Sequence, residues 1–203
     1  MLILASASPR RKELLTQAGL TFTIEAADLD ETPLPNEPAA AYVQRLAIEK
    51  AQAIATRHPG EDITVLAADT AVVIADTSGV GLILGKPSSP VDARRMLALL
   101  SGRTHAVMTG IAALHQGRIA ADVEITQVDV NLISPEEIDT YIDSGEPLDK
   151  AGAYAIQGYA ARWIPHIEGD YFNIVGLPIA RVIALLAELA EATPPLSLVN
   201  PGK

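Results

Sequence analysis

The strongest constraint on the fold is an almost continuously apolar run at residues 64–75 that is rich in β-branched side chains. A strand of this composition is buried on both faces, as in sheets that carry helices on both sides. Asp69 and Thr70 interrupt the run. The pattern therefore predicts a central strand of an α/β sheet, with a carboxylate placed where water is scarce.

The start of the chain predicts a strand, a loop and a helix in succession. Residues 2–5 form a short apolar run, and a helical pattern follows that ends at Gly19. Residues 36–58 have apolar side chains at helical spacing, with Lys50 on the same face. This spacing predicts a long amphipathic helix with a lysine on its apolar side.

Later segments alternate between helix and strand patterns. Ser134, followed by a proline and then by Glu137, forms a capping box that marks the start of a helix. Residues 76–81 are typical of a turn, and residues 146–158 fit neither period. The other predicted elements are a helix at 90–101, strands at 104–114 and 119–133 joined by a hairpin turn, a helix at 135–145, a strand at 163–167 and a helix at 177–190.

These elements predict a mixed α/β fold without an internal repeat or a linker. We expect one domain at residues 1–192 and a flexible tail at residues 193–203. In the second long strand, the apolar residues change from odd positions at Ile125 to even positions at Val128. This change of parity predicts a bulge or a strong twist near Thr126.

The composition excludes several classes of function. The chain has 25 acidic and 15 basic side chains, and its net charge of -10 would repel a nucleic-acid polymer unless the basic groups were gathered on one face. Zero cysteines exclude disulfides, thiolate metal sites and a cysteine nucleophile. No apolar stretch approaches the roughly 20 residues that span a bilayer, and no basic region accompanies the first apolar run, so we expect a cytoplasmic protein without a membrane partner.

The loop at residues 6–11 is a candidate anion site. It joins a strand to a helix start, where unpaired backbone N–H groups and the helix dipole favour negative charge. Two hydroxyls and two guanidiniums frame it, from Ser6, Ser8, Arg10 and Arg11. The alternative is that Ser8 only caps the helix and that the arginines form a solvated face.

Asp69 and two lysines form a second candidate site. A buried carboxylate is costly unless it is paired, hydrogen-bonded or metal-bound, so Asp69 requires a cation nearby. Lys50 on its apolar helix face and Lys86 between a glycine and a proline could supply that charge. The alternatives are a purely structural ion pair, a solvated strand end at Asp69, and a Lys50 side chain that extends to the solvent.

Two further segments carry weaker signals. Asp30 and Glu31 form a carboxylate pair that suits a metal ion, although acidic loop residues are usually just solvated. Residues 146–158 are aperiodic yet rich in specific polar side chains, including Lys150 and Gln157. Long segments of this kind are more typical of binding loops than of spacers.

Taken in this order, the motifs resemble those of the Maf family over residues 2–186. The matching pieces are Leu4-Ala5-Ser6 with Ser8-Pro9-Arg10-Arg11, Asp30-Glu31, Leu46 with Lys50-Ala51, Ala68-Asp69-Thr70, Gly85-Lys86-Pro87, Ser101-Gly102 with Thr104-His105, Glu124 with Thr126, Ser144-Gly145-Glu146-Pro147, Asp149-Lys150-Ala151-Gly152, Ile156-Gln157-Gly158 and Val175-Gly176-Leu177-Pro178. The chain departs from the family at Val130, where an aromatic is common, and at Ala155, where glycine is usual. Neither position touches the predicted chemistry.

The resemblance implies a two-lobed fold related to inosine triphosphate pyrophosphatases, with a mixed β-sheet, flanking helices and a central nucleotide cleft. It also implies that a nucleoside triphosphate is hydrolysed to the monophosphate and pyrophosphate with a divalent metal. Within the family, a subgroup that acts on dTTP and UTP carries the residue types found here at Arg10, Thr70 and Gln157. The subgroup that acts on 7-methyl-GTP differs at all three.

The resemblance and the residue chemistry together predict a role for each candidate residue. Asp69 accepts a proton from the attacking water, and Mg²⁺ or Mn²⁺ bridges Glu31 and the phosphate oxygens. Thr70 and Gln157, with Arg10, select a pyrimidine base. The triphosphate is held by Ser6, Ser8, Arg10, Arg11, Lys50 and Lys86.

Two other function classes stay open at this point. A non-catalytic nucleotide-binding regulator of cell division would keep the basic residues but would not need Asp69. A structural interaction protein would not explain Lys50 and Asp69 on apolar faces. The sequence also leaves open whether the protein forms a homodimer.

Overall fold

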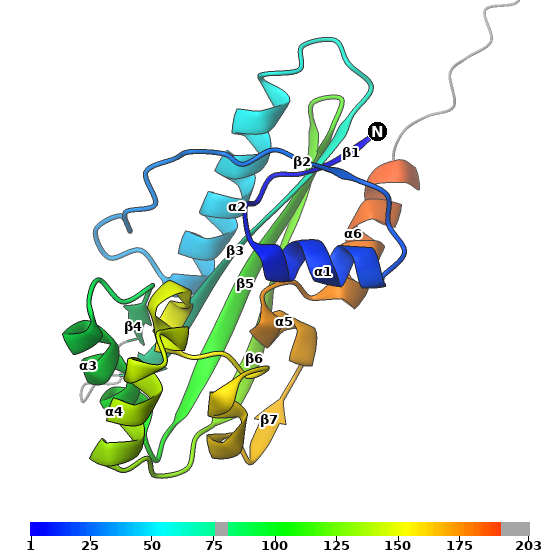
Figure 1. The fold of residues 1–203 in the computed structure, drawn as a ribbon. Helices are drawn as coiled ribbons and strands as arrows, with labels where there is room; N and C mark the ends of the chain where they lie inside the picture. Colours follow the sequence, from blue (N-terminus) through cyan, green and yellow to red (C-terminus); the bar gives the residue numbers. More distant parts are fainter. Residues whose placement is uncertain (76–80, 192–203) are drawn as a thin grey trace, which may run out of the picture.

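The computed structural model describes residues 1–75 and 81–191 of the chain (Figure 1). Most of the predicted turn at residues 76–81 and all of the predicted tail at residues 193–203 lie outside this part. The described strands are β1 (Leu2–Leu4), β2 (Thr23–Ile24), β3 (Thr64–Ala75), β4 (Gly81–Leu84), β5 (Thr104–His115), β6 (Arg118–Asp129) and β7 (His166–Glu168). They form one sheet with the order β2-β1-β3-β5-β6-β7, and β4 pairs with β3. The predicted mixed α/β fold is confirmed.

Serine caps begin three of the helices, as the sequence predicts. Ser8, Ser89 and Ser134 each accept a hydrogen bond from a backbone N–H in the first turn, and Ser134 completes a capping box with Glu137. No helix in the described ranges is long and apolar enough to cross a bilayer. The helices are α1 (Pro9–Gln17), α2 (Ala39–Ala55), α3 (Pro90–Leu100), α4 (Pro135–Asp143), α5 (Tyr171–Val175) and α6 (Ile179–Glu191), with short 3-10 helices η1 (Glu146–Asp149), η2 (Ala151–Ala153) and η3 (Tyr159–Trp163).

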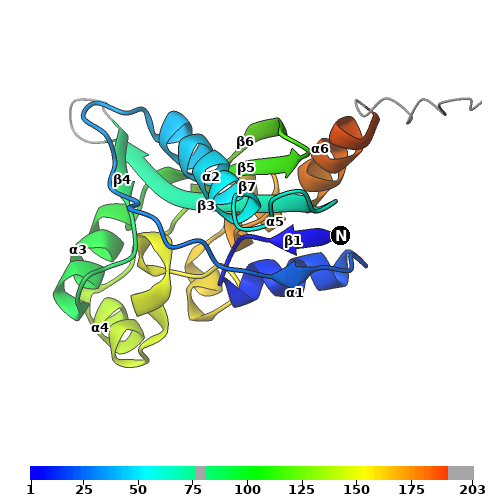
Figure 2. The ribbon, with the colours of Figure 1, turned by 90° about the horizontal axis from the view of Figure 1, so that it is seen from above.

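The predicted central strand is β3, which is buried on both faces. Val65 and other odd-numbered residues pack against α2, in a cluster that includes Ala47. Leu66 and other even-numbered residues face the opposite layer, where Leu14 of α1 and residues of α6 complete the core. Figure 2 shows α2 on one side of the sheet and α1, α3 and α4 on the other. Because successive side chains of a strand point to opposite faces, Asp69 faces α2 and Thr70 faces the other layer.

Two strands share the edge of β3 that faces away from β5. β1 pairs with this edge as far as Leu66, and β4 pairs with it from Val72. None of the described strands pairs with residues 67–71 on this edge. The gap contains Asp69 and Thr70, so the polar interruption of the apolar run lies where loops approach β3.

Of the two features predicted near Thr126, a bulge or a strong twist, the bulge is wrong. β5 and β6 pair in one continuous register along their whole length, with Val107 opposite Thr126. The parity of the apolar residues changes because different layers cover the sheet along its length. Val123 packs toward α2, whereas Val128 belongs to the core on the opposite face. Between them Ile125 is exposed and Thr126 is fully buried.

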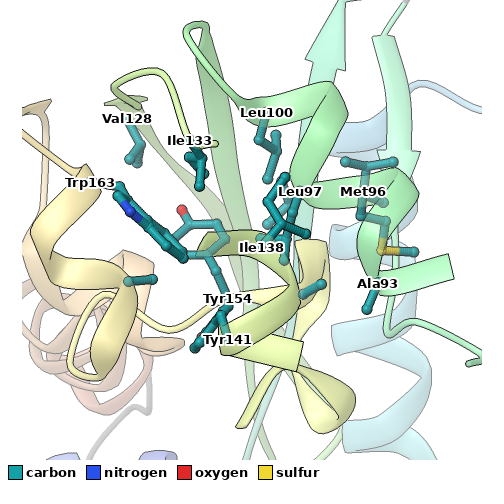
Figure 3. Packing of buried hydrophobic residues seen from close by; sticks show 14 of the residues in the cluster. Ala93, Met96, Leu97, Leu100, Val128, Ile133, Ile138, Tyr141, Tyr154 and Trp163 are labelled. Carbon is teal, nitrogen blue, oxygen red and sulfur yellow. The ribbon is translucent and has the colours of Figure 1, made fainter. Parts of the chain in front are cut away.

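The predicted strand at residues 163–167 is wrong at its start. β7 begins at His166, and Trp163 instead ends η3. The indole of Trp163 packs edge-on against Tyr141 of α4, with ring centroids 5.3 Å apart. Figure 3 shows both rings in the core that α3 and α4 form on this side of the sheet. Burial of a large aromatic side chain outweighs the strand propensity of the short segment.

Gly110 of β5 allows α2 to approach the sheet beside Asp69, its partner on β3. A Cβ atom at this position would lie 2.6 Å from the backbone nitrogen of Gln44, which is closer than real Cβ contacts. We therefore expect Gly110→Ala to lower the free energy of unfolding by about 2 kcal/mol, measured by denaturant titration. Gly85→Ala is the control, because a Cβ there would meet no atom within 4 Å. Equal stability of the two variants would contradict this account of the packing.

Candidate active site

A cavity of about 570 Å³ lies at the gap in the edge of β3. Its walls come from the loop before α1, from α2 and β3, from the segment after β4 and from the segment that follows η1. The structure therefore brings together residues that are far apart in the sequence. Its lining includes every residue predicted for the site: Ser6, Ser8, Arg10, Arg11, Glu31, Lys50, Asp69, Thr70, Lys86 and Gln157.

The loop at residues 6–11 reaches the cavity because β1 ends at Leu4, beside the gap. Ser8 caps α1 and accepts a hydrogen bond from the Arg11 N–H at 3.5 Å. Ser6 Oγ accepts from the Ser8 N–H at 3.3 Å and is buried. The simpler role considered for Ser8, as a helix cap, is therefore present. It also aims the N-terminus of α1 at the cavity, which favours an anion there.

Arg11 fastens the loop to the sheet. Its guanidinium donates to the carbonyl oxygens of Ala68 and Gly176 at 2.8 Å, to Ser6 Oγ at 3.1 Å and to Thr70 Oγ1 at 2.9 Å. A guanidinium has five N–H groups, so one remains for a ligand. Arg11 thus supplies positive charge and holds the loop in place, and it has little capacity left for the predicted phosphate contact.

Lys50 joins two carboxylates at the floor of the cavity. Its Nζ lies 2.7 Å from Asp69 Oδ1 and 2.6 Å from Glu31 Oε1. Lys50 and Asp69 are both buried, whereas the Glu31 side chain is 55% exposed. The ion pair considered as a structural alternative is therefore formed, and it lies inside the cavity. A phosphate group would compete with Glu31 for Lys50.

Asp69 is the buried acid of the site. Burial raises the pKa of its carboxyl, and this effect outweighs the opposing charges of Lys50 and Arg11, while Glu31 adds to the increase. Within the described residues, Asp69 Oδ1 is hydrogen-bonded to Lys50 and Oδ2 has no hydrogen bond. The carboxylate is thus fixed by one oxygen and can accept a proton at the other.

Two positively charged side chains that line the cavity have most of their N–H groups free within the described residues. Lys86 is exposed, and within the described residues its ammonium has no partner. Arg10 lies 3.8 Å from Asp149, whose side chain is 68% exposed, so this ion pair is weak. Both groups are therefore available to a phosphate, unlike Lys50 and Arg11.

Lys150 also lines the cavity, although no role was predicted for it. Its Nζ donates to the Glu146 carbonyl oxygen and to Asp149 Oδ1, both at 2.6 Å. The signal was its place in the aperiodic segment, within the motif Asp149-Lys150-Ala151-Gly152. These contacts connect the cavity wall to η1.

Thr70 begins a chain of buried polar groups. Its Oγ1 lies 2.9 Å from Thr109 Oγ1, and Thr109 donates to the carbonyl oxygen of Asn173 at 3.3 Å. Because Thr109 uses its proton there, Thr70 donates to Thr109 and accepts from Arg11. Thr109 and Asn173 are fully buried. Neither residue was predicted from the sequence, although Asn173 is a polar residue within an apolar segment and could have been detected.

The remaining wall combines aromatic and amide groups. Tyr154 lines the cavity, and its hydroxyl lies 2.7 Å from His105 Nε2. Burial lowers the pKa of His105 to about 4, so this histidine is neutral at pH 7. Gln157 is exposed to the cavity, and its amide forms no hydrogen bond with the part of the chain that is described. It is the polar group of this wall that is free to bind a ligand.

The carboxylates of the cavity could supply only part of the coordination shell of a metal ion. No group of three histidine or carboxylate side chains is placed to hold an ion among residues 1–75 and 81–191. Glu31 and Asp69 nevertheless converge on one atom, Lys50 Nζ. Mg²⁺ commonly takes one or two protein carboxylates and completes its shell with substrate phosphates and water. The donor set is therefore sufficient for a divalent ion only together with a phosphate ligand.

A comparison with models of protein families shows which family the chain belongs to. The model described as Maf-like protein matches residues 1–189. The chain belongs to the Maf family. A Maf relative from Moorella thermoacetica is 50% identical over 188 residues, which cover 92% of this chain and 93% of the relative. One from Koribacter versatilis is 49% identical over 185 residues, which cover 91% and 92%. Both relatives are named dTTP/UTP pyrophosphatase.

A solved structure that resembles this chain is more distant in sequence than these relatives. The Ham1 protein of Staphylococcus aureus has a TM-score of 0.49 and 13% identity, with 94% of this chain and 97% of that chain covered. A structural similarity this low does not support a conclusion about function. The fold rests on the strands and helices described above.

Proposed function

We propose that this Maf protein hydrolyses dTTP and UTP, and related modified pyrimidine nucleotides, to the monophosphate and pyrophosphate in the cytoplasm. The observation that carries the proposal is Asp69, a buried carboxylate with one free oxygen inside a cavity that also presents free cations. The family membership and the names of relatives that share about half of their residues with this chain support it.

The geometry accounts for the reaction as follows. Lys86, Arg10 and the N-terminus of α1 bind the triphosphate, and a water molecule lies against Asp69 Oδ2. The water oxygen forms a bond to the α-phosphorus while the bond from that phosphorus to the oxygen bridging the β-phosphate breaks, and pyrophosphate leaves. The proton of the water passes to Asp69, whose raised pKa suits it to this role. Phosphoryl transfer of this kind depends mainly on positioning and charge stabilisation.

A divalent ion completes the charge balance of the site. Glu31 would hold Mg²⁺ or Mn²⁺ together with phosphate oxygens, because hard carboxylate oxygens suit these ions. When bound, the ion would offset the negative charge of the triphosphate. Lys50 holds the two carboxylates together, with its Nζ 2.6 Å from Glu31 and 2.7 Å from Asp69.

The experiment that tests the function is pyrophosphate release from a panel of nucleoside triphosphates in the presence of Mg²⁺ or Mn²⁺. We expect kcat/KM to be highest for dTTP and UTP, and lower for CTP, the purine nucleotides and 7-methyl-GTP. Release of inorganic phosphate in place of pyrophosphate, or turnover of none of these nucleotides, would contradict the proposal. The second outcome would favour the non-catalytic regulator.

Lys86→Ala separates phosphate binding from base recognition. If Lys86 binds the triphosphate, kcat/KM should fall about 10-fold, and by a similar factor for every accepted nucleotide, because a phosphate carries no base identity. Lys12→Ala on the exposed side of α1 is the control, since Lys12 does not line the cavity. A loss confined to one base would assign Lys86 to the base pocket.

A further inference from the structure

The segment that presents Gln157 is fastened from behind by Glu146. The carboxylate of Glu146 accepts from the Tyr141 hydroxyl at 2.9 Å through Oε1 and from the Tyr159 N–H at 3.4 Å through Oε2. The Tyr141 hydroxyl in turn accepts from the Ala155 N–H at 3.3 Å. Residues 155–159, with Gln157 at their centre, are therefore held at both ends by this carboxylate and hydroxyl.

Gly158 allows this arrangement. A Cβ atom at Gly158 would lie 2.6 Å from Glu146 Cδ, which is closer than real Cβ contacts. The carboxylate thus lies directly against the backbone next to Gln157. Within the segment, the Gly158 N–H donates to the Ala155 carbonyl oxygen at 3.1 Å, which closes a tight turn.

The support behind the segment is rigid. Tyr141 is fully buried and stacks on Tyr159, with ring centroids 5.6 Å apart. Trp163 packs edge-on against both rings. A phenol locked in this core gives the Glu146 carboxylate a fixed partner, so the carboxylate is itself held in one position.

The position of Gln157 matters because its side-chain amide can form hydrogen bonds with two different kinds of base. Gln157 can donate to a carbonyl and accept from the N–H of uracil or thymine, but after a half-turn of the amide it matches the amino group and ring nitrogen of cytosine. The backbone of residues 155–159 sets where the amide meets the base edge, and so which of its two orientations can form both hydrogen bonds. A shift of about 1 Å in the backbone would remove that alignment.

We propose that Glu146 and Tyr141 are positioning residues for base selection, acting through the backbone of residues 155–159 on the alignment of Gln157. This inference rests on the proposed function, because it assumes that the protein prefers uracil and thymine nucleotides. It gives a role to the Glu146 motif, which the catalytic chemistry does not use. Neither residue touches the reacting atoms.

Glu146→Gln tests the proposal with little change in size. If the new NH2 group faces the Tyr159 N–H, that hydrogen bond is lost. If it faces the Tyr141 hydroxyl, the direction of that hydrogen bond is reversed and the hydroxyl proton loses its acceptor. We expect the ratio of kcat/KM for UTP to that for CTP to fall about 10-fold. The inhibition constant of inorganic tripolyphosphate, which has no base, should stay within about 2-fold, since the phosphate contacts are untouched.

Tyr141→Phe is the second variant. It keeps the buried ring and removes the hydroxyl that holds both Glu146 and the Ala155 N–H, so the same loss of preference is expected. Glu136→Gln, on the exposed side of α4, is the matched control and should keep the wild-type ratio. The unfolding temperature of each variant separates a local effect from general destabilisation.

A double-mutant cycle with Gln157→Ala shows whether Glu146 acts through Gln157. If it does, Glu146→Gln should cause no further loss of base preference in the Gln157→Ala background. Independent, multiplicative losses would overturn the proposal, as would a wild-type ratio in both Glu146→Gln and Tyr141→Phe. A wild-type enzyme that does not distinguish UTP from CTP would overturn the proposed function as well, and the other outcomes leave that function intact.

Discussion

Asp69→Asn is expected to reduce turnover by roughly 10²-fold to 10⁴-fold, the range typical of losing a general base. The amide keeps the size of the carboxylate and can still contact Lys50, but it cannot accept a proton from water at neutral pH. Folding should change little, because Lys50 retains its contact with Glu31 at 2.6 Å. The measurement is kcat for dTTP with saturating Mg²⁺, together with the unfolding temperature of the variant.

Asp143→Asn is the matched control, since Asp143 is exposed at the end of α4 and lies outside the cavity. It should retain wild-type turnover. A folded Asp69→Asn protein with near-normal turnover would exclude Asp69 as the base. The nucleotide cavity would then have to activate water in another way.

The pH profile gives an independent check on the same residue. Burial raises the pKa of Asp69 above the ordinary value of 3.8. A base works only when deprotonated, so kcat/KM should decrease as the pH falls through this raised pKa. The acid limb of the profile should therefore lie above the pH at which an ordinary aspartate titrates. The residual activity of Asp69→Asn should lack that limb.

The local elements of the fold could be predicted because their signals are local. The limits of β3 at Thr64–Ala75 follow from a nearly continuous apolar run, and the starts of α1 and α4 follow from serine caps. The bulge near Thr126 was predicted wrongly because the sequence does not show which layer covers each part of a strand. Val123 and Val128 lie on opposite faces of the sheet, and both are packed.

The residues of the site were predictable, but their connections were not. Lys50 and Asp69 could be selected from the sequence because each is a charged side chain within an apolar pattern. The role of Arg11 depends on its bonds to Ala68 and Gly176, which lie 57 and 165 residues away in the sequence. The residues next to Arg11 in the sequence do not show whether its guanidinium holds the loop to the sheet or binds a phosphate. The gap in the edge of β3 depends likewise on where β1 ends and β4 begins.

Gln157→Glu is expected to reduce kcat/KM for UTP and dTTP by roughly 10²-fold, because a site that leaves buried polar groups unpaired rejects its ligand strongly. The amide of Gln157 can donate to a base carbonyl and accept from the adjacent N–H. A carboxylate can still accept from the N–H, but its second oxygen faces the carbonyl and repels it. Binding of inorganic tripolyphosphate should change far less, since Lys86 and Arg10 are unaltered.

The measurement for this variant is kcat/KM for dTTP, UTP, CTP and 7-methyl-GTP, compared with wild type. Gln52→Glu, which adds the same charge at an exposed position of α2, is the control and should keep the wild-type order. The Gln157 amide has no hydrogen bond among the described residues, so its replacement removes no internal hydrogen bond, and a change of order reflects base recognition. An unchanged order of preference would show that Gln157 does not contact the base. Selection would then depend on Arg10 and Thr70, and Thr70 has only one acceptor site left beside its bonds to Arg11 and Thr109.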